Sequence, residues 1–274
     1  MVIYLADPES LPHVWGAWKN SGSRHDVRRQ KRRIRLKDPQ EAAYDDFFGV
    51  VRVAGEPTEL LIRALQDATA AMARLPEASA EPALGEALDV TGIPAAERPP
   101  PEAEAEADAQ WRWMSGHRLF FALTQATVLA LQDALAEPRT ARLCGPGAEA
   151  AGVLLRSSAA ALRLTASFSP ADYQSVVRPA MEPPQFPATG FSGFWSADHR
   201  VLLQRLEAWG RSHHSSCAPD CPVRVGLLGA VDEVYESHIG VCRRFVGSRP
   251  SLLGGSDDAT ATLSKLARRR RRLL

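Results

Sequence analysis

Apolar residues recur at helical spacing in several long stretches of the chain, and this pattern limits the fold more than any other feature. In His117–Leu135, one helical stripe carries Phe121, Gln125, Val128 and Leu131. The same spacing returns at Thr58–Leu75, Ala148–Phe168, Ser196–Trp209 and Pro222–Phe245, and we expect Thr58 and Ser196 to cap the starts of their helices. Because few runs alternate as strands do, the sequence predicts an all-α fold.

Stretches rich in proline and alanine indicate how the chain is divided. Pro76–Ala109 contains three successive prolines followed by alternating Glu and Ala, and we expect a mobile or weakly helical linker there. This linker would separate an N-terminal basic and helical segment, residues 1–75, from a helical core, residues 110–274. Four prolines in Arg178–Pro187 predict a loop.

Charge and hydropathy exclude some classes of protein. A formal net charge of +1 over 274 residues argues against a dedicated nucleic-acid binder. We interpret the basic segments Arg24–Lys37 and Arg268–Arg272 as solvated surface, with a patch for RNA or an acidic partner as the alternative. No run approaches the roughly 18 uninterrupted apolar residues of a membrane span, and the N-terminus lacks the pattern of a signal peptide. We therefore expect a cytoplasmic protein with no membrane partner.

Four cysteines in a chain of this length do not indicate a disulfide framework. Cys144 is expected to be an ordinary buried or half-buried thiol. The residues His213, His214, Cys217 and Cys221 offer enough ligands for zinc, but they crowd into nine positions of one segment. Exposed thiols are therefore preferred over a zinc site.

Two histidines, His199 and His238, interrupt the apolar stripes of two predicted helices. One such histidine is usually a satisfied core residue, but two on separate helices indicate a shared ligand, and imidazole is an axial ligand of haem iron. Cys242 follows His238 by one turn on the same face, about 6 Å along the helix. A thiol there could form a thioether with a haem vinyl group, although the order H-x-x-x-C reverses the usual c-type motif.

Three segments carry a resemblance to a known group of enzymes. His238–Gly247, followed by Gly254-Gly255-Ser256, resembles the haem-ligand region of the tryptophan 2,3-dioxygenase superfamily of histidine-ligated, haem-dependent aromatic oxygenases. Ser192–Arg200 is similar to their Ser-Gly-Phe-Gln-Ser stretch, which ends in an arginine on the substrate side. Phe121–Thr127 is similar to their Phe-x-x-x-His-Gln-Thr helix. The matches span Leu119–Leu263 in the family's order.

The chain departs from the dioxygenases at one position, because their distal histidine would fall at Gln125, while His199 appears beside Arg200. The order His199, 38 intervening residues, His238 and then Cys242 is similar to one branch of the superfamily. That branch contains the peroxide-using 3-methyl-L-tyrosine hydroxylases of saframycin-type antibiotic pathways. The resemblance implies a helical haem-binding bundle with a c-type haem, attached through Cys242 and ligated axially by His238 and His199.

The same resemblance implies a monooxygenase that converts 3-methyl-L-tyrosine to 3-hydroxy-5-methyl-L-tyrosine with hydrogen peroxide, in natural-product biosynthesis. His199 would leave the iron during catalysis and assist proton transfer. The residues implied for substrate binding are Arg200, Ser192, Phe121 and Gln125. Its partners would be a small aromatic amino acid and peroxide, in a homo-oligomer. Two alternatives stay open: an indole-cleaving haem dioxygenase, and a non-enzymatic electron carrier or sensor with bis-histidine haem.

Overall fold

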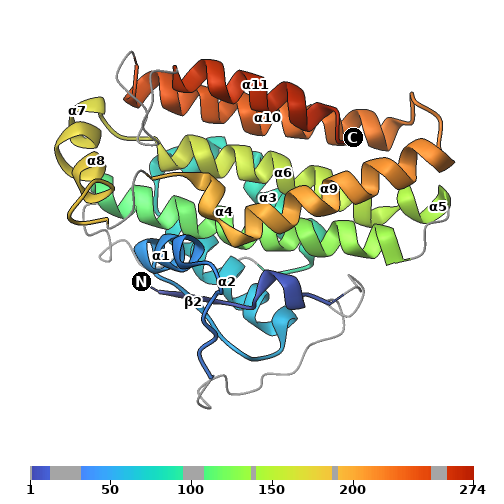
Figure 1. Ribbon diagram of the computed structural model, residues 1–274, viewed down its shortest axis with the longest axis horizontal. Coiled ribbons are helices and arrows are strands. Elements are labelled where there is room, and N and C mark those ends of the chain that lie inside the picture. Colours follow the sequence, from blue (N-terminus) through green and yellow to red (C-terminus); the bar gives the residue numbers. More distant parts are fainter. Residues whose placement is uncertain (1, 13–31, 95–107, 137–139, 187–190, 248–257) are drawn as a thin grey trace.

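The computed structural model describes residues 2–12, 32–94, 108–136, 140–186, 191–247 and 258–274. Its long helices are stacked side by side (Figure 1). Helices α10 and α11 lie along one edge, α4, α6 and α9 form the middle, and the N-terminal strands cover the opposite side with α1 and α2. Of the basic segment Arg24–Lys37, residues 24–31 lie outside the described ranges.

The first half of the chain consists of short elements followed by the longest helix. They are β1 (Ile3–Leu5), the 3-10 turn η1 (Pro8–Ser10), α1 (Pro39–Phe48), β2 (Val50–Arg52), α2 (Pro57–Met72), the 3-10 turn η3 (Pro76–Ala80), α3 (Pro82–Thr91) and α4 (Ala109–Ala136). The second half is helical. It contains α5 (Thr140–Leu143), α6 (Pro146–Thr165), α7 (Pro170–Asp172), the π-helical turn η5 (Tyr173–Val177), α8 (Arg178–Ala180), the 3-10 turn η6 (Gly193–Trp195), α9 (Ala197–Ser216), α10 (Pro222–Phe245) and α11 (Ala259–Arg271).

The predicted all-α class is confirmed, with one small addition. Strands β1 and β2 pair in parallel, with Ile3 opposite Val50 and Leu5 opposite Arg52. Ile3, Leu5 and Val50 are almost fully buried. This pair was not predicted, because the periodicity of a three-residue strand cannot be told from that of a short loop.

Helices α4 and α6 form the centre of the core. The two helices approach closely because each has a glycine at a point of contact with the other. Gly116 of α4 faces Thr165 of α6, and Gly147 of α6 faces the backbone of Ala130 of α4. A side chain at either glycine would collide with these neighbours. Within the described residues, α4 is also long and apolar enough to cross a membrane, but 78% of its most apolar window is buried, as in the core helix of a globular protein.

The helix boundaries depend on caps. α10 has the predicted bounds, with Pro222 in its first turn and Gly247 in a left-handed conformation after its end. The predicted Ser196 cap of α9 is confirmed, since its Oγ accepts from the His199 backbone N–H at 3.3 Å. The predicted cap at Thr58 is wrong. Glu56 caps α2 instead, because Pro57 takes the first helical position, which suits proline.

The predicted loop Arg178–Pro187 is partly helical, and the predicted mobile or weakly helical linker Pro76–Ala109 contains a helix. The first residues of Arg178–Pro187 form α8, where Pro179 lies in the first turn and its missing N–H costs no hydrogen bond. Within Pro76–Ala109, helix α3 packs on α6 through buried Leu84 and Ala87, while residues 95–107 lie outside the described ranges. The division of the chain into three parts at residues 75 and 110 stays a prediction.

Candidate active site

A cavity of about 420 Å³ lies between α4, α9, α10 and α11, with residues 191–196 in its wall. Aromatic and aliphatic side chains form most of the lining, among them Phe120, Phe121, Tyr173, Phe191, Val234 and Leu266. Sites for cofactors and small ligands are commonly of this size and character, with a few polar groups placed in an apolar wall. Three of the polar residues of this cavity are histidines.

Helix α10 contributes His238 and Cys242 to the lining. Only four of its residues are fully buried, and the face that carries Val234, Tyr235, His238, Val241 and Cys242 is turned to the cavity. His238 and Cys242 therefore lie one helical turn apart on the same wall, as their spacing predicts. Burial raises the pKa of the Cys242 thiol to about 11, so the group is protonated at neutral pH.

His199 reaches the same cavity from the first turn of α9. The backbone of this turn is held by the Ser196 cap, and the side chain of the preceding residue, Asp198, is fully buried. The structure thus brings together His199, His238 and Cys242, the three residues that the sequence analysis assigns to a haem. Neither of these two imidazoles forms a hydrogen bond to any other described residue.

A third histidine in the cavity was not singled out from the sequence. His117 on α4 lines the cavity, and its Nδ1 lies 2.7 Å from the carbonyl oxygen of Trp113. Its ring stacks on Phe48 with centroids 4.2 Å apart. His117 lies one turn before Phe121 on the same face of the helix. The apolar stripe through Phe121 could therefore have identified His117 from the sequence.

Burial lowers the pKa of His117, His199 and His238 to about 4 each. A proton on His238 would further lower the pKa of His117 and of His199, because the three imidazoles face the same cavity. All three are therefore neutral at pH 7. Neutral imidazole is the form that binds a metal.

Phe121 and Ser192 also line the cavity, as expected for substrate-binding residues. The ring of Phe121 packs against Tyr44 and Phe48, with centroids 5.8 Å apart in each pair. The Oγ of Ser192 accepts a hydrogen bond from the backbone N–H of Phe194 and caps the turn η6. Both residues are thus in place to contact a ligand.

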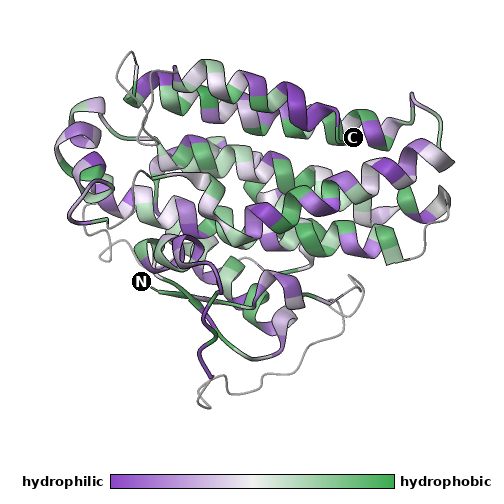
Figure 2. Ribbon diagram, in the orientation of Figure 1, coloured by the Kyte–Doolittle hydropathy of each residue, from purple (hydrophilic) through white to green (hydrophobic). Residues whose placement is uncertain are grey.

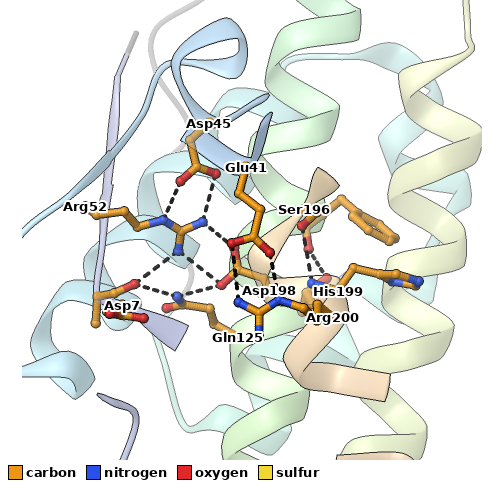
Figure 3. A network of polar contacts seen from close by, with 12 residues as sticks. Asp7, Glu41, Asp45, Arg52, Gln125, Ser196, Asp198, His199 and Arg200 are labelled. Carbon is orange, nitrogen blue, oxygen red and sulfur yellow. Dashed lines mark hydrogen bonds and ion pairs between the residues drawn. The ribbon is translucent and has the colours of Figure 1, made fainter. Parts of the chain in front are cut away.

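Gln125 does not line the cavity. It is fully buried on another face of α4, where its amide donates to the carbonyl of Ala6 at 2.9 Å and to Asp198 at 2.8 Å. Figure 3 shows it inside the same network as Arg52 and Asp45. Its contacts connect α4 to the N-terminal segment and to α9. The position expected for a substrate contact therefore has a structural role.

Arg200 also lies away from the cavity lining. Its Nε donates to Glu41 at 2.7 Å and its Nη1 to Glu9 at 2.6 Å (Figure 3). These hydrogen bonds hold the pKa of the guanidinium above its usual value. Successive helical positions point His199 and Arg200 in different directions, and the arginine pairs with two carboxylates of the protein.

Arg270 of α11 is the cation found at this site. It lines a second, smaller cavity of about 30 Å³. Tyr235 and His199 line both this cavity and the main one. Among the described residues, the Nε of Arg270 is buried without a hydrogen-bond partner, while its side chain is hydrogen-bonded to Tyr235. Its charge lowers the pKa of His199. The sequence analysis placed it in a solvated basic tail. The arginine-rich end of α11 is indeed among the most hydrophilic parts of the fold (Figure 2). Arg270 nevertheless lines the smaller cavity.

With this geometry established, known proteins provide a comparison. The profile of the SfmD 3-methyl-L-tyrosine peroxygenase family matches residues 5–222. The chain belongs to this family. The match includes His199 and ends at the start of α10, before His238 and Cys242. The roles expected for these two residues of α10 stay predictions.

Two individual proteins are similar to the chain. A 3-methyl-L-tyrosine peroxygenase of Streptomyces lavendulae is 32% identical over 165 residues, which are 58% of this chain and 44% of that protein. The chain thus matches less than half the length of this relative. A crystal structure of reduced SfmD, soaked with sodium hydrosulfite, superposes with a TM-score of 0.59 at 25% identity, covering 88% of this chain and 98% of that one. The predicted resemblance to 3-methyl-L-tyrosine hydroxylases is confirmed, while the wider relation to tryptophan 2,3-dioxygenases stays a prediction.

Proposed function

We propose that the protein is a haem-dependent peroxygenase that hydroxylates the aromatic ring of a tyrosine derivative. The expected reaction converts 3-methyl-L-tyrosine and hydrogen peroxide to 3-hydroxy-5-methyl-L-tyrosine and water. One peroxide oxygen enters the ring carbon–hydrogen bond and the other leaves as water, so no further reductant is needed. Membership of the SfmD family supports this reaction class. The place of the reaction in antibiotic biosynthesis rests on the resemblance alone.

The observation that carries this proposal is the pair of histidines His199 and His238, which face one apolar cavity without hydrogen-bond partners among the described residues. Both side chains are half-buried and line the cavity, so their ring nitrogens are open to a ligand there. Ligation of an iron would use these free nitrogens. The chemistry of the donors and the apolar wall thus fit a haem, which when bound would supply the iron that activates peroxide.

Cys242 would attach the cofactor covalently. Because burial keeps its thiol protonated, the S–H bond can add across a vinyl group, with sulfur bonding to one carbon and hydrogen to the other. This addition needs no oxidant. The thioether would hold the macrocycle against the wall of α10 that also carries His238.

The remaining groups suit an aromatic amino acid. Phe121 and Phe191 offer apolar surface to the ring, and Ser192 offers a hydroxyl. Arg270 is the cation available to the substrate carboxylate, since Arg200 is already paired with Glu9 and Glu41. At a pKa of about 4, His199 is a poor base in its buried position. Its proposed role in proton transfer therefore requires that it move to a more solvated position, where its pKa returns toward 6.5.

The test is incubation of the haem-loaded protein with hydrogen peroxide and either 3-methyl-L-tyrosine, tyrosine or tryptophan, followed by mass analysis of the products. A catechol heavier by one oxygen from a tyrosine substrate supports the proposal. A ring-opened tryptophan with two added oxygens would support the dioxygenase alternative, and no turnover would support an electron carrier. A cytoplasmic location, a homo-oligomeric state and the absence of nucleic-acid and membrane partners stay predictions.

A further inference from the structure

Three of the four cysteines gather at the end of the molecule where α9 turns into α10. The Sγ of Cys144 lies 3.4 Å from the Sγ of Cys217 and 3.3 Å from the Sγ of Cys221. Cys144 comes from the turn between α5 and α6, more than 70 positions earlier in the chain. A disulfide needs sulfurs about 2.05 Å apart, so the three thiols are close but not bonded, and all are free.

A histidine completes this group. His213, in the last turn of α9, is 1% exposed, and neither of its ring nitrogens has a hydrogen-bond partner. The ligand atoms of Cys144, His213 and Cys221 all lie within 4.8 Å of one another. None of these residues lines the cavity described above. The buried imidazole thus has no hydrogen-bond partner among the described residues and lies close to two thiols. These three groups are of the types that bind a metal ion.

We propose that Cys144, His213 and Cys221, with Cys217 as the fourth ligand, bind a structural zinc ion. Three thiolates and one imidazole form a common closed, tetrahedral zinc site. With Zn–S bonds of about 2.3 Å, tetrahedral geometry sets sulfurs about 3.8 Å apart, a few tenths of an ångström more than the thiol separations found here. The Sγ of Cys217 lies 3.4 Å from the Sγ of Cys144 but outside the group whose ligand atoms are all within 4.8 Å of one another, so its side chain would move toward the ion to take the fourth position.

The surroundings already hold these ligands in place. Trp209 packs against the His213 ring with centroids 4.8 Å apart, and its Nε1 donates to the carbonyl of Leu143, next to Cys144. Cys221 is the N-cap residue of α10, where the helix dipole stabilises a thiolate. Arg224 donates to the carbonyl of Pro219 in the loop between the two later cysteines, and brings a positive charge beside a site of net charge −1.

This site corrects the interpretation from sequence, which weighed only ligands within one segment. The missing ligand was Cys144, from a distant turn. The sequence did not distinguish His214 from His213 as a ligand. His214 is exposed, and its Nδ1 lies 2.7 Å from the carbonyl oxygen of Gly210. A bound ion would connect the α5–α6 turn to the end of α9 and the start of α10, the two helices that carry His199 and His238.

The experiment measures metal content of the purified full-length protein by elemental mass spectrometry, and the variants Cys144→Ser, His213→Ala and Cys221→Ser are compared with His214→Ala. We expect about one zinc per chain in the wild type and in His214→Ala, and loss of most of it in the three ligand variants. Cys242→Ser should keep its zinc, which separates this site from the proposed haem. Cys217→Ser should keep more zinc than the three ligand variants, because Cys217 lies outside the group whose ligand atoms are all within 4.8 Å of one another.

A second measurement covers the case that a ligand variant does not fold. Wild-type protein grown with cobalt should show the intense visible ligand-field bands of a tetrahedral, thiolate-rich cobalt site. Wild-type protein that holds no stoichiometric zinc and lacks these bands would overturn the proposal. So would an intact mass two hydrogens lighter than the sequence under mild conditions, because that mass shows a disulfide among these cysteines.

Discussion

Arg52 and Asp198 form a buried ion pair, in which Arg52 Nη2 lies 2.5 Å from Asp198 Oδ2 and neither side chain is more than 2% exposed. Arg52 also donates to Asp45, through Nε at 2.7 Å and Nη2 at 2.9 Å (Figure 3). Asp198 directly precedes His199 in the first turn of α9. Strand β2 therefore positions the start of the helix that brings His199 to the cavity.

We predict that Arg52→Met destabilises the protein by about 3–5 kcal/mol, since it leaves Asp45 and Asp198 buried without their common partner. Urea denaturation followed by circular dichroism measures the loss. The matched control is Arg33→Met, because Arg33 pairs with Asp46 at 2.7 Å while both side chains are about two-thirds exposed. An exposed pair contributes about 0–1 kcal/mol. Equal effects of the two substitutions would contradict the role assigned to Arg52.

The two proposed iron ligands should differ in importance. His238 is held in the middle of α10, whereas His199 lies in the first turn of α9, where local opening costs less. His238→Ala should lose most of its haem, and His199→Ala should keep haem but change from a low-spin to a high-spin optical spectrum. His117→Ala is the control, since it should stay low-spin. An unchanged low-spin spectrum in His199→Ala would show that the distal assignment is wrong.

Covalent attachment through Cys242 can be tested separately. Acid–acetone extraction should leave the haem with the wild-type protein and release it from Cys242→Ser. Cys144→Ser also removes a thiol, but one outside the cavity, so its haem should stay attached. Intact mass should exceed the polypeptide by one haem only in the variants that keep Cys242. Complete release of haem from the wild type would exclude the thioether.

The sequence predicted well those features that depend on local patterns. The bounds of α10 follow from Pro222 and Gly247, and its cavity face follows from the helical period that joins His238 to Cys242. The Ser196 cap belongs to the same group. Each of these needs only residues within one or two helical turns, so a single sequence contains the information.

Features that depend on distant contacts could not be predicted in this way. Glu9 and Glu41, more than 150 positions before Arg200, bind its guanidinium. Helix α4 is buried around most of its circumference, so its apolar pattern does not show that His117 faces the cavity while Gln125 faces the N-terminal segment. Arg270 could not be distinguished from the other arginines of Arg268–Arg272, because charge alone does not show which arginine of a helix faces the interior.

Acid should destabilise the haem-free protein through its buried histidines. The folded-state pKa of His117, His199 and His238 is about 4, below the value of about 6.5 in an unfolded chain. Between these values the unfolded state binds more protons, so the free energy of unfolding rises with pH. The stabilisation is complete above about pH 6.5 and is lost as the pH falls through 4, with a slope of up to about 1.4 kcal/mol per pH unit for each histidine.

Denaturation at pH 7 and pH 5 measures this slope, and His117→Phe should reduce it. Asp45 acts in the opposite direction, because burial raises its folded-state pKa to about 6 and its contribution is lost as the pH rises through that value. Asp67, whose pKa is raised by burial, acts with Asp45, and His213, whose pKa is lowered by burial, acts with the other three histidines. Among the described residues, four histidines thus oppose two carboxyl groups, so the net slope stays positive. A protein that is more stable at pH 5 than at pH 7 would contradict the neutral state of the three histidines.

Arg270, and not Arg200, should bind the carboxylate of the substrate. Its buried Nε has no partner, and a hydrogen bond between charged groups contributes about 1.5–3 kcal/mol. Arg270→Gln should therefore weaken binding of 3-methyl-L-tyrosine roughly 10- to 100-fold, at 1.4 kcal/mol per factor of ten, while haem content stays unchanged. Arg200→Gln should leave binding nearly unchanged. The matched ligand is the corresponding amine without a carboxylate, which should bind equally to wild type and Arg270→Gln. If Arg270→Gln weakens binding of the amino acid and of the amine equally, Arg270 acts by shaping the cavity. If only Arg200→Gln weakens binding of the amino acid, Arg200, the residue expected from the sequence, binds the carboxylate.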